Sequence, residues 1–230
     1  MSLRNFSFPA IGIVAIALIF LLILFLPLMI LGVVGRALSQ YGLSWFWYLL
    51  FLIGSLAGST VNLPIWKKKV QQLASSEKYV YFFGIPYPVQ TRESRTMEAI
   101  ISINLGGAIL PLMLSAYLLL KNPAAALPSL FTLAIVAFLM FFVSKPVVGV
   151  GIVTPMFIPP IVAAITAIIL GSNYAPVVAY AGGTLGTIIG ADLFHLNSLE
   201  KMGAVNVSIG GAGTFDGIFL TGLFAVLLAY

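Results

Sequence analysis

Seven apolar runs, each long enough to cross a membrane, alternate with short polar connections along the 230 residues of the chain. A helix needs about 20 apolar residues to span the hydrocarbon core of a bilayer. The pattern therefore predicts an all-α, polytopic transmembrane helix bundle that forms a single membrane domain, residues 1–230. The predicted spans are about 10–35, 43–63, 98–120, 127–144, 147–170, 174–194 and 213–230.

Two of these runs have features of their own. The first is longer than the apolar segment of a signal peptide, about 7–15 residues, and no small-residue cleavage site follows it, so we expect a retained helix. The fifth contains Pro155, Pro159 and Pro160. Proline removes a backbone donor and clashes with the preceding turn, so this span is predicted to be kinked or broken.

The longest connection, residues 64–97, is expected on the cytoplasmic side. Its segment YVYFFGIPYPVQ is rich in aromatic and β-branched residues around Gly84 and Pro86, which favours a hairpin or an interfacial segment. An ordinary loop at the membrane surface is the simpler expectation.

Composition supports the membrane assignment and excludes several chemistries. Charged residues make up 7% of the chain, whereas soluble domains carry about 25%. The absence of cysteine excludes disulfides and thiolate sites, and a single histidine, His195, excludes a multi-histidine metal site within one chain. We therefore expect no metal and no cofactor. The net charge of +5 does not indicate a nucleic-acid partner, because the basic residues flank the spans.

The basic residues also predict the orientation. Alternating spans place nine of them on one side and two, Arg36 and Lys121, on the other. The positive-inside rule then puts the N-terminus in the cytoplasm, and we expect an integral protein of the cytoplasmic membrane of a prokaryote. The nine are Arg4, Lys67, Lys68, Lys69, Lys78, Arg92, Arg95, Lys145 and Lys201.

Two of the six acidic residues have no ordinary explanation. The others lie in loops or, like Glu98, at a predicted helix start, where an acid suits the positive end of the helix dipole. Asp192 lies near the cytoplasmic end of span six, and Asp216 lies about one turn into span seven from the same side. Acids inside membrane spans usually serve a function. The alternative is that both are ordinary helix-end residues.

Glycines accompany both aspartates: Gly186 and Gly190 precede Asp192, and Gly213 and Gly217 flank Asp216. Small residues let helix backbones approach closely, so the two acids are predicted to face each other across a tight helix pair. Two close carboxylates share a proton, which raises one of the two pKa values. One carboxylate can then activate water as a general base while the other, protonated, polarises a carbonyl.

Two aspartates on spans six and seven, near the cytoplasmic side, resemble the presenilin and signal-peptide-peptidase type of intramembrane aspartyl protease. In that family a tyrosine precedes the first aspartate, where this chain has Ala191, and the second closes a Gly-x-Gly-Asp motif, of which Gly213 to Asp216 keeps only the first glycine. The family's later Pro-Ala-Leu motif is missing, and Asn62-Leu63-Pro64 or Pro155 are the candidates to replace it. The whole chain is also similar to a prokaryotic membrane family of unknown function that has the same Gly-Ala-Asp and Phe-Asp-Gly elements.

The segment AVNVSIGGAG, residues 204–213, alternates Val205, Val207 and Ile209 with small or polar residues. Such alternation predicts a short strand, and an exposed strand edge binds an unwound peptide by β-augmentation. The alternative is a loop that ends in flexible glycines. His195 follows Asp192 by three residues; it either anchors at the interface or joins both aspartates in a metal site, although one histidine with two acids is a poor zinc set.

The sequence therefore predicts an enzyme that hydrolyses peptide bonds of a membrane-embedded polypeptide, with Asp192 and Asp216 as the catalytic pair. In this hypothesis Gly190, Gly213 and Gly217 support the pair, and Val205, Val207 and Ile209 bind the substrate. The main alternative is a proton- or cation-coupled transporter or channel that uses the same acids. A structural protein without chemistry is the third. The lipid bilayer is a further expected partner, and the sequence does not specify the oligomeric state.

Overall fold

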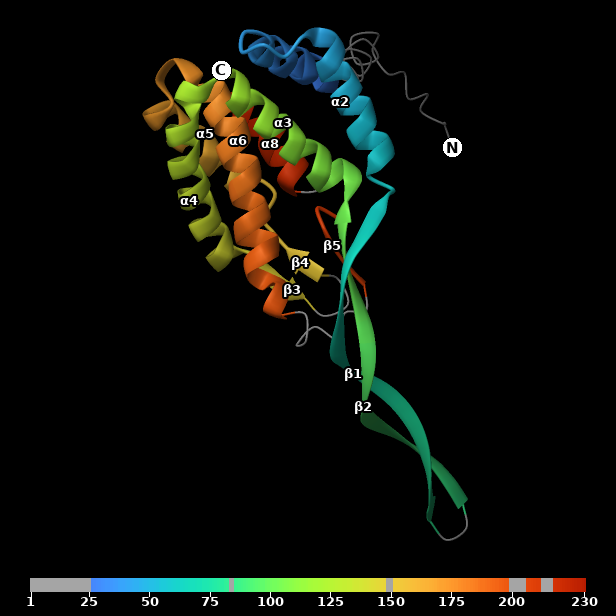
Figure 1. Cartoon of the computed structure of the whole chain (residues 1–230). Helices are drawn as coiled ribbons and strands as arrows, with labels where there is room; N and C mark the ends of the chain where they lie inside the picture. The colour runs from blue at the N-terminus through green and yellow to red at the C-terminus, as the bar shows by residue number, and fades with distance from the viewer. Residues whose placement is uncertain (1–25, 83–84, 148–150, 199–205, 212–216) are drawn as a thin grey trace, which may run out of the picture.

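The computed structural model describes residues 26–82, 85–147, 151–198, 206–211 and 217–230. The described chain is mostly helical, with seven helices, and a long two-stranded ribbon extends from one end of the helix bundle (Figure 1). The helices are Leu26–Ser39, α2 (Trp45–Gly58), α3 (Leu110–Lys121), α4 (Ala126–Val143), α5 (Ile158–Leu170), α6 (Ala175–Thr187) and α8 (Gly217–Ala229).

Short helical turns of other types extend three of these helices. A π-helical turn, η1 (Leu105–Ile109), precedes α3, and a second, η4 (Ile188–Asp192), continues α6. The 3₁₀ turns are η2 (Pro123–Ala125), η3 (Ser172–Tyr174) and η5 (Leu193–Ser198). Asp192 therefore lies near the end of a nearly continuous helical segment, where η4 meets η5.

Within the residues that the structure describes, two helical segments are long and apolar enough to cross a membrane, namely Pro123–Val143 with 21 residues and Ser172–Leu196 with 25. The other described apolar helices have 10–17 residues. Each predicted span thus contains a helix, but the predicted lengths were wrong for several of them. The reason is that extended backbone takes the ends of the apolar runs: residues 98–104 belong to a strand, and so do residues 151–153.

The long connection is a β-hairpin rather than an ordinary surface loop. Strands β1 (Asn62–Phe82) and β2 (Ile85–Asn104) pair antiparallel along their whole length, with Asn62 opposite Asn104 and Phe82 opposite Ile85. At about 3.4 Å per residue, strands of this size extend about 65 Å. The hairpin predicted around Gly84 and Pro86 is confirmed, and the all-α class is corrected to a mostly helical fold with a sheet.

Glu98 belongs to β2, so its predicted place at a helix start was wrong. It forms an ion pair with Lys67 on β1, with 3.9 Å between the charged atoms. Both side chains are more than half exposed, at 63% and 70%, so solvent screens the pair and it adds little stability.

Strand β5 (Asn206–Ile209) joins the hairpin as a third strand, and the sheet order is β1-β2-β5. It runs parallel to β2, with Ile100 opposite Asn206 and Ile103 opposite Ile209. The sheet therefore attaches the segment before α8 to the base of the ribbon.

The fifth apolar run is broken, as its prolines predict. Strands β3 (Lys145–Val147) and β4 (Gly151–Val153) form a small hairpin, and α5 starts only at Ile158. Pro159 and Pro160 lie in the first turn of α5. Proline is tolerated there because the first helical N–H groups have no intrahelical partner, so the prolines start a helix instead of kinking one.

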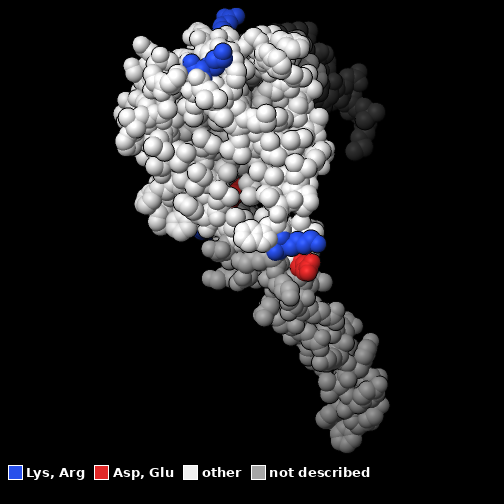
Figure 2. Space-filling view, viewed as in Figure 1, with Lys and Arg blue, Asp and Glu red and all other residues white. Residues whose placement is uncertain are grey.

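The bundle exposes apolar side chains and buries hydroxyls. Large apolar residues on α2, α4 and α5 are exposed, for example Phe46 at 68%, Phe138 at 62% and Ile169 at 72%. Figure 2 shows a broad band without cationic side chains on the face in view, with a small acidic spot in its middle and cationic side chains near its two ends. Helix interfaces rich in small and hydroxyl residues beneath an apolar surface are typical of membrane bundles. The buried hydroxyl residues are Ser55, Ser115, Ser129, Ser144, Thr132, Thr184, Thr187 and Thr221.

Glycines set the distance between α6 and α4. A Cβ added at Gly190 would lie 2.3 Å from the carbonyl oxygen of Ala137, and one at Gly186 would lie 2.7 Å from Cβ of Val136. Gly190 therefore permits a close helix contact with α4, whereas the prediction was a close contact between the two helices next to the aspartates.

Different glycines serve the contact between α6 and α8. A Cβ at Gly183 would lie 3.0 Å from Cγ2 of Thr221, and one at Gly222 would lie 2.7 Å from the Tyr180 ring. At Gly217 a Cβ would meet nothing within 4 Å, so the predicted packing role of this glycine was wrong. Gly213 lies outside the described residues.

We predict that Gly190→Ala lowers the free energy of unfolding by about 1–3 kcal/mol, because the added methyl group overpacks the contact with α4. Gly217→Ala is the matched control, since the space beside that residue is open. Unfolding of both variants in detergent, followed by circular dichroism, measures the difference. Equal stabilities for the two variants would contradict the packing role of Gly190.

Candidate functional site

Asp192 connects the end of a long helical segment to the sheet. It is the last residue of the π-helical turn η4, and its side chain is partly buried. Its Oδ2 accepts a hydrogen bond of 3.0 Å from the backbone N–H of Gly210, which directly follows β5. π-Helical turns often occur at functional sites, because they shift side chains away from their regular helical positions. The carboxylate therefore faces the segment that leads into α8.

The position of Gly210 is fixed by a close backbone contact. Its φ is +66°, a conformation that suits glycine. A Cβ added here would lie 2.7 Å from the carbonyl carbon of Gly107, and a Cβ at Gly107 would lie 2.1 Å from the carbonyl oxygen of Gly210. Only a pair of glycines fits this contact, which holds the Gly210 amide where Asp192 accepts its hydrogen bond.

A network of asparagine amides supports the same junction. Asn104 is fully buried, and its Oδ1 accepts a 2.7 Å hydrogen bond from the Gly107 N–H. Its Nδ2 donates to the carbonyl of Ser59 at 2.7 Å and to Oδ1 of Asn62 at 2.9 Å. Asn62 Oδ1 also accepts a 2.6 Å hydrogen bond from Ser208 Oγ. One network therefore joins β1, β2, β5 and η1.

Ser208 was not among the residues predicted for the site. The period of two along a strand could have identified it, because Val207 and Ile209 face the core and Ser208 between them faces the other side. The sequence shows that alternation, but it does not show that Asn62 lies across from Ser208.

The strand predicted before the glycine cluster is present at residues 206–209, and the loop alternative was wrong for these residues. Val207 and Ile209 are buried, at 8% and 6% exposure, so their side chains anchor the strand instead of facing a ligand. Val207 packs with Ile101. Val205 lies outside the described residues. In the described part of the chain, no strand pairs with the other edge of β5, so its main chain is the part that could receive a peptide.

Asp216 lies outside the described residues, and α8 begins at the next residue, Gly217. A contact between two threonines joins the helices next to the two acids: α6 comes before Asp192 in the chain, and α8 comes after Asp216. The hydroxyls of Thr187 on α6 and Thr221 on α8 are 3.5 Å apart. Asp192 comes five residues after Thr187, and Asp216 comes five residues before Thr221. The same number of residues therefore separates each aspartate from this contact in the sequence.

His195 is buried, and its Nδ1 lies 2.9 Å from the carbonyl oxygen of Ala191, to which a ring N–H there donates. Its ring lies 5.4 Å from that of Phe141 on α4. The histidine therefore packs between two helices and bonds to its own backbone. Within the described residues, no group of three or more His, Cys, Asp or Glu side chains could hold a metal ion.

Comparison with known proteins gives a family but no activity. Neither the curated proteins nor the solved structures contain a match. A family model described as "Protein of unknown function (DUF1614)" matches residues 56–228, which include both aspartates, the asparagine pair and β5. Because this match covers most of the sequence, the chain belongs to the DUF1614 family of proteins of unknown function.

Proposed function

We propose that the chain is a polytopic integral protein of a prokaryotic cytoplasmic membrane, with its N-terminus and the β1–β2 ribbon on the cytoplasmic side. The apolar outer surface of the bundle and its buried hydroxyls support this placement. So does the distribution of basic residues: Lys67 and Lys145 lie on strands at the ribbon end, and Arg36 and Lys121 lie near helix ends at the other. The lipids of the bilayer then surround the helix bundle.

Within that placement we propose an intramembrane aspartyl protease with Asp192 and Asp216 as its catalytic pair. The observation that carries the proposal is the hydrogen bond between Asp192 and the Gly210 amide, which brings the carboxylate to the segment between β5 and α8. The Thr187–Thr221 contact also supports the proposal, because it joins α6 and α8 at positions five residues along the sequence from Asp192 and from Asp216.

The chemistry needs only the two carboxylates and water. The ionised carboxylate removes a proton from water, whose oxygen attacks the peptide carbonyl carbon, while the protonated carboxyl donates its proton to the carbonyl oxygen. Collapse of the tetrahedral intermediate breaks the C–N bond and transfers a proton to the leaving nitrogen. A carboxyl pair of this kind gives a bell-shaped pH dependence of kcat/KM, since one group must be ionised and the other protonated.

The substrate of the proposed enzyme is a membrane-embedded polypeptide, held in extended form along β5. The side chains of Val207 and Ile209 hold the strand against the core, and its outer main-chain edge supplies donors and acceptors for β-augmentation. The short distance along the chain from β5 to Asp216 would place a bound peptide beside the carboxylates.

Transport of a proton or cation is the second candidate. The observation that favours it is a set of buried hydroxyls on α4 and α6 that have no hydrogen-bond partner, those of Ser129, Thr132 and Thr184. Buried polar groups are normally satisfied, so these hydroxyls are suited to contact a passing ion or water.

Cleavage of a fluorescent single-span reporter by the purified protein in liposomes tests the main proposal. Asp192→Asn and Asp216→Asn should each reduce kcat/KM by at least about 1,000-fold, because each variant removes a group that acts in the transition state. Glu98→Gln is the matched control, since it removes an exposed acid of the same protein and should leave cleavage unchanged.

The same assay separates the two candidates. No cleavage by the wild type across several reporters and pH values, together with proton or cation flux that Asp192→Glu partly retains, would replace the protease proposal with transport. Cleavage that persists in Asp192→Asn would exclude this residue as a catalytic acid or base.

A pair of variants in β5 tests the strand edge. Val207→Ala reduces packing but keeps the backbone N–H, whereas Val207→Pro also removes that N–H. We expect Val207→Pro to lose at least as much thermal stability in detergent as Val207→Ala, and, in protein that remains folded, at least about tenfold more kcat/KM. Equal cleavage rates at equal stability would contradict peptide binding through the main chain of β5.

A further inference from the structure

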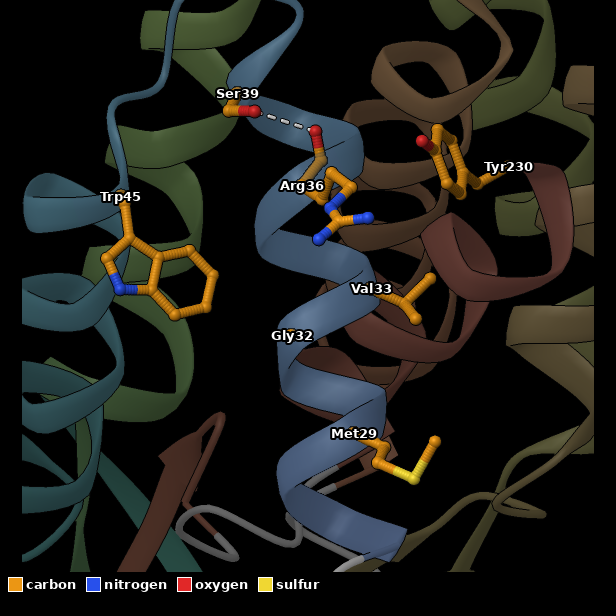
Figure 3. Close-up of a pocket in the computed structure, with 7 residues that line it drawn as sticks. All are labelled: Met29, Gly32, Val33, Arg36, Ser39, Trp45 and Tyr230. Carbon is orange, nitrogen blue, oxygen red and sulfur yellow. Dashed lines mark hydrogen bonds between the residues drawn. The ribbon is translucent and has the colours of Figure 1, made fainter.

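The end of the bundle that carries the C-terminus has a pocket of about 610 Å³. It lies along the helix Leu26–Ser39, far from Asp192 in the fold, because Tyr230 at the C-terminus lies at the end of the bundle opposite the sheet (Figure 1). The residues that line it are Met29, Gly32, Val33, Arg36, Ser39, Trp45 and Tyr230 (Figure 3).

The lining is apolar at one end of the helix and polar at the other. Met29, Val33 and Arg36 follow a spacing of four and three residues, which places them on one helix face. Figure 3 shows these three side chains on the same side of the helix, with the Tyr230 ring beside Arg36. The rise from Met29 to Arg36 is about 10 Å at 1.5 Å per residue. At Gly32, between them, an added Cβ would meet nothing within 4 Å, so the slot beside the helix is open.

The cation of the pocket lacks an acidic partner within the described chain. Lys67 and Glu98 form the one ion pair among the side chains that the structure describes, and they belong to the sheet. Arg36 is exposed and lies within one turn of the helix end at Ser39, whose hydroxyl donates to the Arg36 carbonyl at 2.7 Å. An arginine at the rim of an apolar slot offers paired donors to a phosphate group.

We propose that this pocket binds an anionic phospholipid, with the phosphate at Arg36 and an acyl chain along Met29 and Val33. The proposal rests on the membrane placement given above and not on protease activity. In that placement Arg36 lies at the level of the lipid headgroups and the slot at the level of the acyl chains. Trp45, half exposed at the start of α2, fits the aromatic belt at the same level. The arrangement of charge and apolar surface matches a lipid better than a free anion.

Native mass spectrometry of the full chain, purified in detergent and stripped of lipid, tests the site. Phosphatidylglycerol should bind the wild type about tenfold more tightly than phosphatidylcholine does, and Arg36→Gln should abolish this preference. Lys121→Gln is the matched control: it removes the same charge at the same end of the bundle but outside the pocket, so the preference should persist.

A second variant tests the slot separately from the charge. Gly32→Phe places a ring in the slot, starting from a Cβ position that has open space around it, and keeps Arg36; it should weaken binding of both lipids about tenfold. Inorganic phosphate at millimolar concentration should not displace phosphatidylglycerol. The proposal is wrong if Arg36→Gln keeps the lipid preference, if Gly32→Phe binds like the wild type, or if inorganic phosphate alone competes. Cleavage plays no part in this measurement, so a failed protease assay leaves its result unchanged.

Discussion

The fully buried amide of Asn104 is the interaction on which the rest of the structure depends. Where a buried chain changes from a strand to a helix, the backbone groups freed at that change need new hydrogen-bond partners. Asn104 is that partner for the Gly107 N–H and the Ser59 carbonyl, and it also positions Asn62 for Ser208. Through these bonds the ribbon, the third strand and the first turn of the helical segment that contains α3 form one unit.

The division of α6 into two packing faces follows from its glycines. Gly182, Gly186 and Gly190 face α4, while Gly183 faces α5 and α8, where Gly222 receives Tyr180 and Thr184. With both faces in close contact, α6 has little freedom to rotate, and its π-helical end presents Asp192 to the Gly210 amide. The aspartate is thus positioned by packing along the whole helix. A membrane enzyme needs that rigidity to hold a carboxylate in place for reaction. An ion carrier would instead need part of the helix to move.

The two ends of the bundle carry different chemistry. At the ribbon end, the Asp192 carboxylate accepts a hydrogen bond from the residue that follows β5, and one edge of β5 has no partner strand among the described residues, which suits a reaction on an extended chain. At the other end, a cation meets an open apolar slot, which suits a lipid. Membership of the DUF1614 family adds no activity to this comparison, so the case for proteolysis rests on the contact between Asp192 and Gly210 and on the resemblance of two aspartates in the sequence, near the ends of predicted spans six and seven.

The sequence by itself predicted a helix in each of the seven apolar runs, a break near the prolines of the fifth run, a hairpin within the 64–97 connection, and a short strand before the glycine cluster. These features follow from local chemistry: apolar length, the missing N–H of proline and the alternation of side chains. Only the tertiary structure decided that 98–104 and 151–153 are strands, because a short apolar run suits a buried helix or a buried strand equally well and pairing partners choose between them. It also decided that Gly190 contacts α4, that Glu98 pairs with Lys67, and that Val207 faces the core, since the choice of neighbour depends on how whole helices and strands pack.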